Sequence, residues 1–70
     1  MPAQTFHLEG DYVELNQLLK LAGIAASGGE GKHLVADGLV TVDGAIELRK
    51  TCKIRAGQVV AIDDETIHVL

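Results

Sequence analysis

One stretch near the middle of the chain most constrains the fold, because it predicts a helix start, a helix end and a hairpin turn in succession. Ser27 and Glu30 have the spacing of a capping box, in which two side chains satisfy free amides at a helix start. Gly38 is placed to end this helix in the left-handed conformation. Asp43-Gly44 follows a β-prone run and is typical of a two-residue hairpin turn. We therefore expect a helix over 28–37 that leads directly into a β-hairpin.

The flanking segments predict one more helix and several short strands. Asp11 and Glu14 form a second capping-box pattern, which predicts a helix that opens at Asp11 and ends at Gly23. Its buried stripe would consist of Leu15, Leu18, Leu19 and Ala22. Strands are expected at 5–8, 39–42, 45–48, 51–54, 59–62 and 66–70, with turns at 56–58 and 63–65. Helices and strands are segregated along the chain, so the expected class is α+β.

Charge is unevenly distributed along the chain. The formal net charge is −4, which taken alone argues against nucleic-acid binding. However, four of the six basic residues, Arg49, Lys50, Lys53 and Arg55, fall within 49–55, a segment without an acidic residue. At about 0.15 M salt a charge acts over only ~8 Å, so a local basic patch on an acidic body can still attract phosphate. The charge pattern therefore leaves nucleic-acid binding open.

Length and cysteine content narrow the class of protein. Seventy residues predict a single small domain over 1–70. The single cysteine, Cys52, excludes an internal disulfide framework and fits a reducing compartment. No secretion signal or apolar run of membrane-spanning length is evident, so we expect a cytoplasmic protein that does not engage a membrane.

The stretch from Glu14 to Ile62 resembles the S4-type RNA-binding domain, and most closely its small stand-alone bacterial members. The family pattern places a leucine in a first helix, a glycine at its end, a capped second helix with a basic residue, and two glycine-containing β-segments. The matching residues are Leu15, Gly23, Ser27, Gly31-Lys32, Gly38-Leu39-Val40-Thr41-Val42-Asp43-Gly44 and Ile54-Arg55-Ala56-Gly57-Gln58-Val59-Val60. The spacing fits without gaps over this motif core.

The resemblance implies a fold and a function. The implied fold is a helix-turn-helix-like pair, the αL motif, packed on a small antiparallel twisted sheet. The implied function is binding of structured RNA, often ribosomal, without catalysis and without a cofactor. Two positions depart from the family, which often has arginine where this chain has Glu14 and Gly28. Lys32 and Lys53 do match positions that are often basic in the family.

These observations define a candidate RNA-binding surface. It comprises Lys32, Arg49, Lys50, Lys53 and Arg55, with Ser27, Gly28 and Lys20 as further candidates. Several cations on one face displace counterions from phosphates, and arginine adds bidentate geometry. The structural alternative is a solvated strand edge, where basic residues prevent aggregation.

Other chemistries find little support. The run containing Gly31-Lys32 is not a phosphate-binding P-loop, because Ala26 and His33 stand where that motif requires glycine and serine or threonine. His7, His33 and His68 have no cysteine or carboxylate at metal-ligand spacing, so no metal site is expected. Cys52 is interpreted as a small core residue, and Asp63-Asp64-Glu65 as a solvated turn. We expect no enzymatic activity.

A protein-interaction or carrier domain of the small β-grasp kind is the alternative function. The Val-Thr-Val-Asp-Gly run followed by Ala-Gly-Gln-Val-Val is similar to the sulfur carriers. Such carriers use a terminal Gly-Gly, whereas this sequence ends His68-Val69-Leu70, and two consecutive helices before the hairpin do not fit that fold. We expect a monomer, and the sequence does not identify the RNA target.

Overall fold

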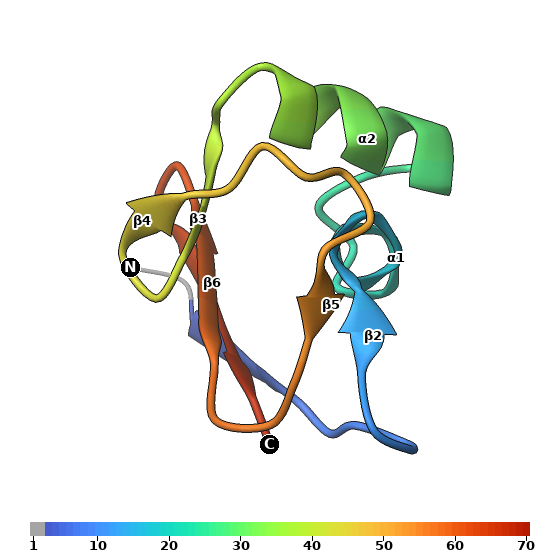
Figure 1. Cartoon of the computed structure of the whole chain (residues 1–70), viewed down its shortest axis with the longest axis vertical. Coiled ribbons are helices and arrows are strands. Elements are labelled where there is room, and N and C mark those ends of the chain that lie inside the picture. The colour runs from blue at the N-terminus through green and yellow to red at the C-terminus, as the bar shows by residue number, and fades with distance from the viewer. Residues whose placement is uncertain (1–2) are drawn as a thin grey trace.

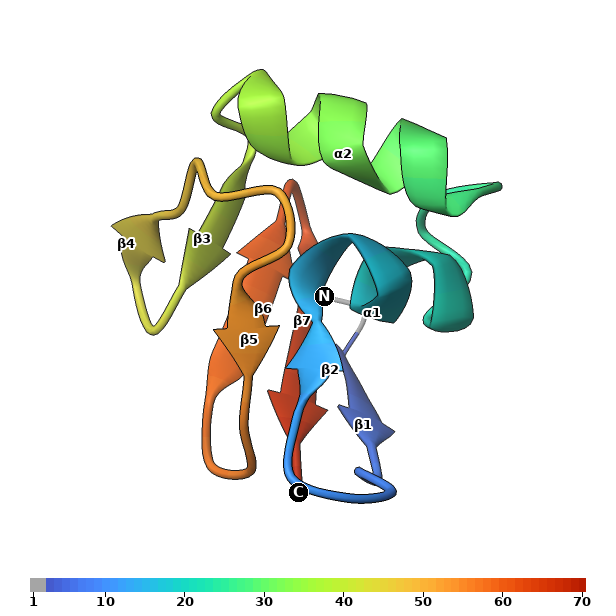
Figure 2. The same cartoon turned by 45° about the vertical axis from the view of Figure 1, so that its right-hand side comes forward.

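The fold consists of a five-stranded sheet, a separate two-stranded ribbon that leads into the first helix, and a second helix that packs on the first, over the end of the strands (Figures 1 and 2). The computed structural model describes residues 3–70; the first two residues of the expected domain lie outside this range. The elements are β1 (Ala3–Phe6), β2 (Val13–Glu14), α1 (Leu15–Leu21), α2 (Gly28–Ala36), β3 (Val40–Val42), β4 (Ala45–Ile46), β5 (Lys53–Ile54), β6 (Val59–Ile62) and β7 (Glu65–Val69). The expected α+β class is confirmed. Among the described residues, neither helix has the length and apolar character needed to cross a bilayer.

The main sheet has the order β1-β7-β6-β3-β4. Its pairs are antiparallel except that β1 runs parallel to β7, in a register from Ala3↔Thr66 to Phe6↔Val69. The sheet is therefore mixed, and β1 lies earlier in the chain than the strand expected at 5–8. β5 belongs to the ribbon instead, where it pairs antiparallel with β2.

The helix–hairpin unit predicted from the middle of the chain is present. Ser27 Oγ accepts a hydrogen bond from the Glu30 amide at 3.1 Å, and Glu30 Oε1 accepts one from the Ala26 amide at 3.1 Å. The carboxylate thus reaches one residue further back than in the usual capping box. Gly38 has a φ of 75°, and the hairpin residues Asp43 and Gly44 have φ values of 53° and 87°, as a type I′ turn requires.

The predicted start of the first helix at Asp11 is wrong. Val13 and Glu14 form β2, the helix begins at Leu15, and the Glu14 side chain makes no capping hydrogen bond. The reason is tertiary: β5 offers Val13 and Glu14 a partner strand, and the chain before β5 supplies acceptors for the helix. The Leu15 amide donates to the Cys52 carbonyl at 2.8 Å, and the Asn16 amide donates to the Lys50 carbonyl at 3.2 Å.

Two different contacts shorten the strands on either side of the 47–52 loop. The expected strand at 51–54 shrinks to Lys53–Ile54, because residues before it turn their carbonyls toward α1. The return strand of the hairpin ends at Ile46 and not at Leu48. The Glu47 carboxylate accepts a hydrogen bond from the Arg49 amide at 3.0 Å, and this contact bends the chain after the strand.

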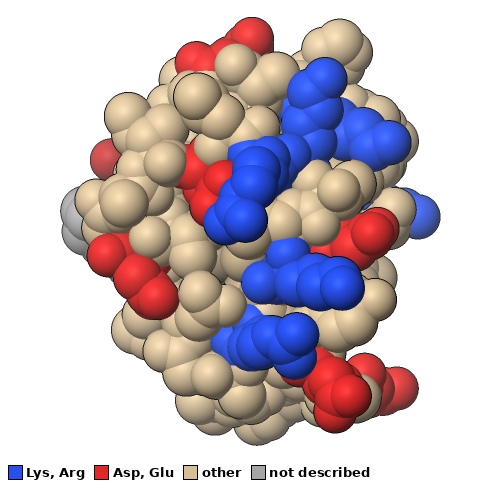
Figure 3. All heavy atoms as spheres, viewed as in Figure 1, with Lys and Arg blue, Asp and Glu red and all other residues tan. Residues whose placement is uncertain are grey.

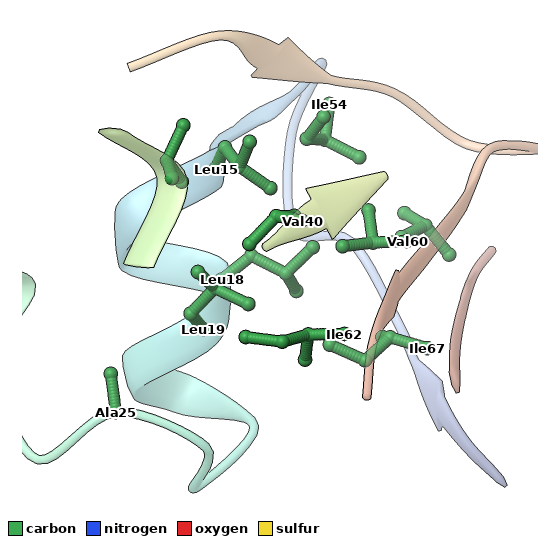
Figure 4. Packing of buried hydrophobic residues seen from close by; sticks show 11 residues of the cluster. Leu15, Leu18, Leu19, Ala25, Val40, Ile54, Val60, Ile62 and Ile67 are labelled. Atoms are coloured by element: carbon green, nitrogen blue, oxygen red, sulfur yellow. The ribbon is translucent and has the colours of Figure 1, made fainter. Parts of the chain in front are cut away.

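One hydrophobic core joins the helices, the ribbon and the main sheet (Figure 4). The predicted leucine stripe of α1 is fully buried, and Ala22 and the half-buried Cys52 pack at its margin. The buried residues are Leu15, Leu18, Leu19, Ala25, Val35, Val40, Ile54, Val60, Ile62, Ile67 and Val69. Because Ile54 is the inward residue of β5, burying it anchors the basic segment to the domain.

The two helices approach each other closely at Gly31. An ideal Cβ at this position would lie 2.5 Å from the Asn16 carbonyl oxygen and 3.1 Å from Asn16 Cα. Both are backbone atoms of α1, which cannot rotate away. Gly31 is therefore required by the close contact of α1 with α2, and its lower helix propensity is the cost of that contact.

We predict that Gly31→Ala lowers the free energy of unfolding by roughly 2–3 kcal/mol, since the added methyl group must push the helices apart. Gly29→Ala is the matched control, because its Cβ would meet only Ser27 Oγ at 3.8 Å. Alanine favours the helix by up to about 1 kcal/mol over glycine, so the control should be neutral or stabilising. Urea unfolding followed by circular dichroism measures both, and equal effects at the two positions would contradict this account.

Candidate nucleic-acid interface

Basic side chains gather on one face of the molecule. Figure 3 shows lysine and arginine side chains in a band that extends from the region of α2, across the loop before β5, to β5 itself. The residues that these elements contribute, called the basic band below, are Lys32 of α2, Arg49 and Lys50 of the 47–52 loop, Lys53 of β5 and Arg55 directly after it. All five are exposed. Acidic side chains border the band on this face (Figure 3).

Backbone hydrogen bonds to α1 hold the loop that carries part of this band. The Lys50 and Cys52 carbonyls accept the first amides of α1, and the Cys52 amide donates to the Arg49 carbonyl at 3.2 Å. These bonds direct the backbone polar groups inward, while the Arg49 and Lys50 side chains remain exposed. The cations of the loop therefore stand on a backbone that the helix start keeps in place.

Arg49 is already paired with a carboxylate. Its Nε lies 2.9 Å from Glu47 Oε2 and its Nη2 lies 3.0 Å from Glu47 Oε1, a bidentate pair. Hydrogen bonds from the Arg49 side chain, and then from its backbone amide, lower the pKa of Glu47 to about 2. The same pair raises the pKa of Arg49. A phosphate must compete with Glu47 for this guanidinium, so Arg49 is the least available cation of the loop.

The Cys52 thiol lies beside this ion pair without being activated by it. Its Sγ is 3.5 Å from Arg49 Nη2 and 3.6 Å from Glu47 Oε1. Burial, followed by the nearby Glu47 charge, raises the pKa of the thiol. Cys52 therefore stays protonated at neutral pH and serves as a packing residue.

Lys53 and Arg55 both lie over an aromatic ring that the sequence analysis did not select. Lys53 Nζ is 5.0 Å and Arg55 Cζ is 5.7 Å from the centroid of Tyr12. Tyr12 directly precedes β2, so the register Val13↔Ile54 brings it beside Arg55 across the ribbon. Arg55 Nη1 also donates a long hydrogen bond of 3.5 Å to the Asp11 carbonyl. Only the pairing of β2 with β5, which replaced the expected helix start, could have identified this cluster.

Glu14, one of the two departures from the S4 pattern, lies within the band. It is the cross-strand partner of Lys53, and partners in an antiparallel pair present their side chains on the same face. Glu14 is exposed and places a negative charge beside Lys53. The departure therefore weakens the positive potential at the ribbon.

The start of α2 is less open than a phosphate-binding helix end. Ser27 Oγ accepts the Glu30 amide, and the Glu30 carboxylate lies at the same helix end. Gly28 is half-buried, and its carbonyl accepts a 3.5 Å hydrogen bond from Asn16 Nδ2. Lys20 lies in the last turn of α1, on a different element from the basic band. RNA contacts by Ser27, Gly28 and Lys20 remain predictions.

Comparison with known proteins identifies relatives of similar size. A protein of Escherichia coli (strain K12) named "Putative RNA-binding protein YbcJ" is 49% identical over 59 residues, covering 84% of each chain. "Uncharacterized protein YbcJ" of Shigella flexneri matches with the same identity and coverage. The solution structure of E. coli YbcJ, described as revealing an αL motif involved in RNA binding, aligns with a TM-score of 0.73 at 48% identity. That alignment covers 94% of this chain and 85% of YbcJ.

The family model described as S4 domain matches residues 6–70. This range contains both helices, the β2–β5 ribbon and every residue of the basic band. Together with the YbcJ structure, which supports the two-helix arrangement on a sheet, the match confirms the resemblance noted in the sequence. The chain belongs to the S4-domain family.

Proposed function

We propose that this protein binds structured RNA through the basic band and catalyses no reaction. The observation that carries the proposal is the gathering of basic side chains on one face of a protein whose net charge is −4 (Figure 3). Support comes from membership of the S4-domain family and from the RNA-binding description of YbcJ. Ribosomal RNA in the cytoplasm is the target class that the family resemblance favours.

The charge distribution favours recognition of the RNA backbone. Lys32, Lys50, Lys53 and Arg55 release counterions when they approach phosphates, and the acidic remainder of the surface repels RNA. The protein would therefore dock in one orientation, with α2 and the ribbon facing the RNA. Double-stranded RNA is recognised mainly by its shape and its phosphates, which suits a surface of this kind.

We predict that Lys50→Gln combined with Lys53→Gln weakens binding and flattens its salt dependence. About four phosphate contacts give a log–log salt slope near −3 to −4 for the unaltered protein, and removing two should reduce its magnitude by about 1.5. Fluorescence anisotropy with a labelled ribosomal RNA fragment, at salt concentrations between about 50 and 200 mM, measures both quantities. Circular dichroism checks that the fold is retained.

The matched control for this double variant is Ala3→Glu combined with Thr5→Glu. Both residues are exposed on β1, which pairs with β7 and not with the ribbon, and the control changes the net charge by the same amount. It should leave the salt slope nearly unchanged. Equal losses in the two double variants would mean that only total charge matters, and the basic band would then not be the binding surface.

We predict that Glu47→Gln strengthens RNA binding, because it releases Arg49 from its bidentate pair. The expected gain in affinity is about two- to fivefold, the range that an exposed ion pair contributes. Titration of the same RNA fragment measures the gain. A decrease in affinity would show that Glu47 supports binding by positioning Arg49.

The Glu47 pair should also make stability depend on pH. The pKa of Glu47 is about 2 in the folded protein and 4.5 in its unperturbed state, so ionised Glu47 stabilises the fold above about pH 4.5. That contribution is lost as pH falls from 4.5 toward 2. Glu47→Gln should therefore unfold at a slightly lower temperature than the unaltered protein at pH 7, with the difference vanishing near pH 2. A difference that stays constant over this range would exclude the ion pair as its cause.

A further inference from the structure

The Tyr12 ring is exposed beside two cations. The chain contains two aromatic residues, Phe6 and Tyr12; Phe6 is half-buried, whereas Tyr12 is 42% exposed. Lys53 and Arg55 lie over the ring at 5.0 and 5.7 Å from its centroid. A tyrosine in this position offers a flat, partly apolar surface within the most basic part of the ribbon.

Tyr12 also lines the hollow between β1 and the start of β2. The hollow has a volume of about 380 Å³, and Phe6, Leu8, Val13 and Leu21 contribute apolar walls to it. His7 and Glu9 provide polar groups at its margin. The hollow therefore has mainly apolar walls and polar groups at its margin, and Tyr12 connects it to the two cations. An unpaired base, which has an apolar face and a polar edge, matches this lining.

We infer that Tyr12 is a stacking platform for one unpaired nucleotide of the bound RNA, with its base on the ring beside the hollow and its phosphate on Lys53 and Arg55. The inference rests on the proposed RNA-binding function and adds a preference to it. Backbone contacts along the basic band would hold any structured RNA. The Tyr12 site would favour RNA in which a bulge or loop leaves a base unstacked.

Binding of a nucleotide is favourable because its base replaces the two cations on the Tyr12 ring. A cation–π contact at an exposed site is weak, so Lys53 and Arg55 can move from the ring to a phosphate. A base that stacks on an aromatic side chain contributes more than such a contact. The two cations lie within 6 Å of the ring centroid, so a single nucleotide can bring its base to Tyr12 and its phosphate to either side chain.

Two RNA hairpins with the same stem test the inference, one fully paired and one with a single bulged adenosine. The chain has one tyrosine and no tryptophan, so its tyrosine emission reports on Tyr12 alone. At about 50 mM salt both hairpins should bind, but the bulged hairpin should bind more tightly and quench the emission more strongly. A third hairpin carries the fluorescent base 2-aminopurine at the bulge, whose emission should fall when it stacks on the protein.

Two variants separate stacking from other roles of Tyr12. Tyr12→Ala should weaken binding of the bulged hairpin by about tenfold, leave the paired hairpin nearly unaffected, and abolish the 2-aminopurine response. Tyr12→Phe keeps the aromatic face and should retain both the preference and the response. Thermal unfolding checks that the variants are folded. The quenching of tyrosine emission is measured on the unaltered protein, so this part of the test does not depend on the stability of a variant.

The outcomes distinguish the inference from the function on which it rests. Equal binding and equal quenching by the two hairpins would overturn the stacking site while leaving RNA binding intact. Equal losses for both hairpins with Tyr12→Ala would have the same meaning, because they would reduce Tyr12 to a support for the ribbon. If neither hairpin binds, even at low salt, the proposed function itself fails.

Discussion

The arrangement of the candidate site depends on one pair of backbone hydrogen bonds, from the Leu15 and Asn16 amides to the Cys52 and Lys50 carbonyls. The first amides of a helix need acceptors, and no side chain of α1 provides them. The acceptors come instead from a segment that is distant in sequence and rich in lysine and arginine. The same two hydrogen bonds therefore cap α1 and hold the backbone of the basic loop in place.

This arrangement explains which parts of the fold could be anticipated. The capping pattern at Ser27 and the Asp43-Gly44 turn are local signals, and both elements form where their residues indicate. The sequence predicts the wrong start for α1, because Asp11 and Glu14 satisfy the local capping rule, whereas in the fold β5 offers Val13 and Glu14 a partner strand. Local rules cannot anticipate an acceptor that lies on a distant part of the chain.

The candidate site shows the same division between local and tertiary signals. The basic residues were visible as a run of charge, but neither the pairing of Arg49 with Glu47 nor the position of Tyr12 could be inferred from spacing. Both depend on tertiary contacts, one at the bend after β4 and the other on the pairing of β2 with β5.

Glu14 and Glu47 also place negative charge beside the cations. On the proposed RNA-binding surface, such charges would reduce affinity for nonspecific RNA and make binding depend more on the match between the surfaces.

The pairing of β1 with β7 has a consequence for the order of folding during synthesis. β1 is translated early, but its hydrogen-bond partners lie at residues 65–69, so it has no strand to pair with until nearly the whole domain has left the ribosome. Ile67 and Val69, which complete the core, arrive at the same late stage. Contacts between such distant residues slow folding, so the helices and the β3–β4 hairpin have time to form first. The nascent domain would then carry an unclosed sheet edge until residues 65–69 have emerged.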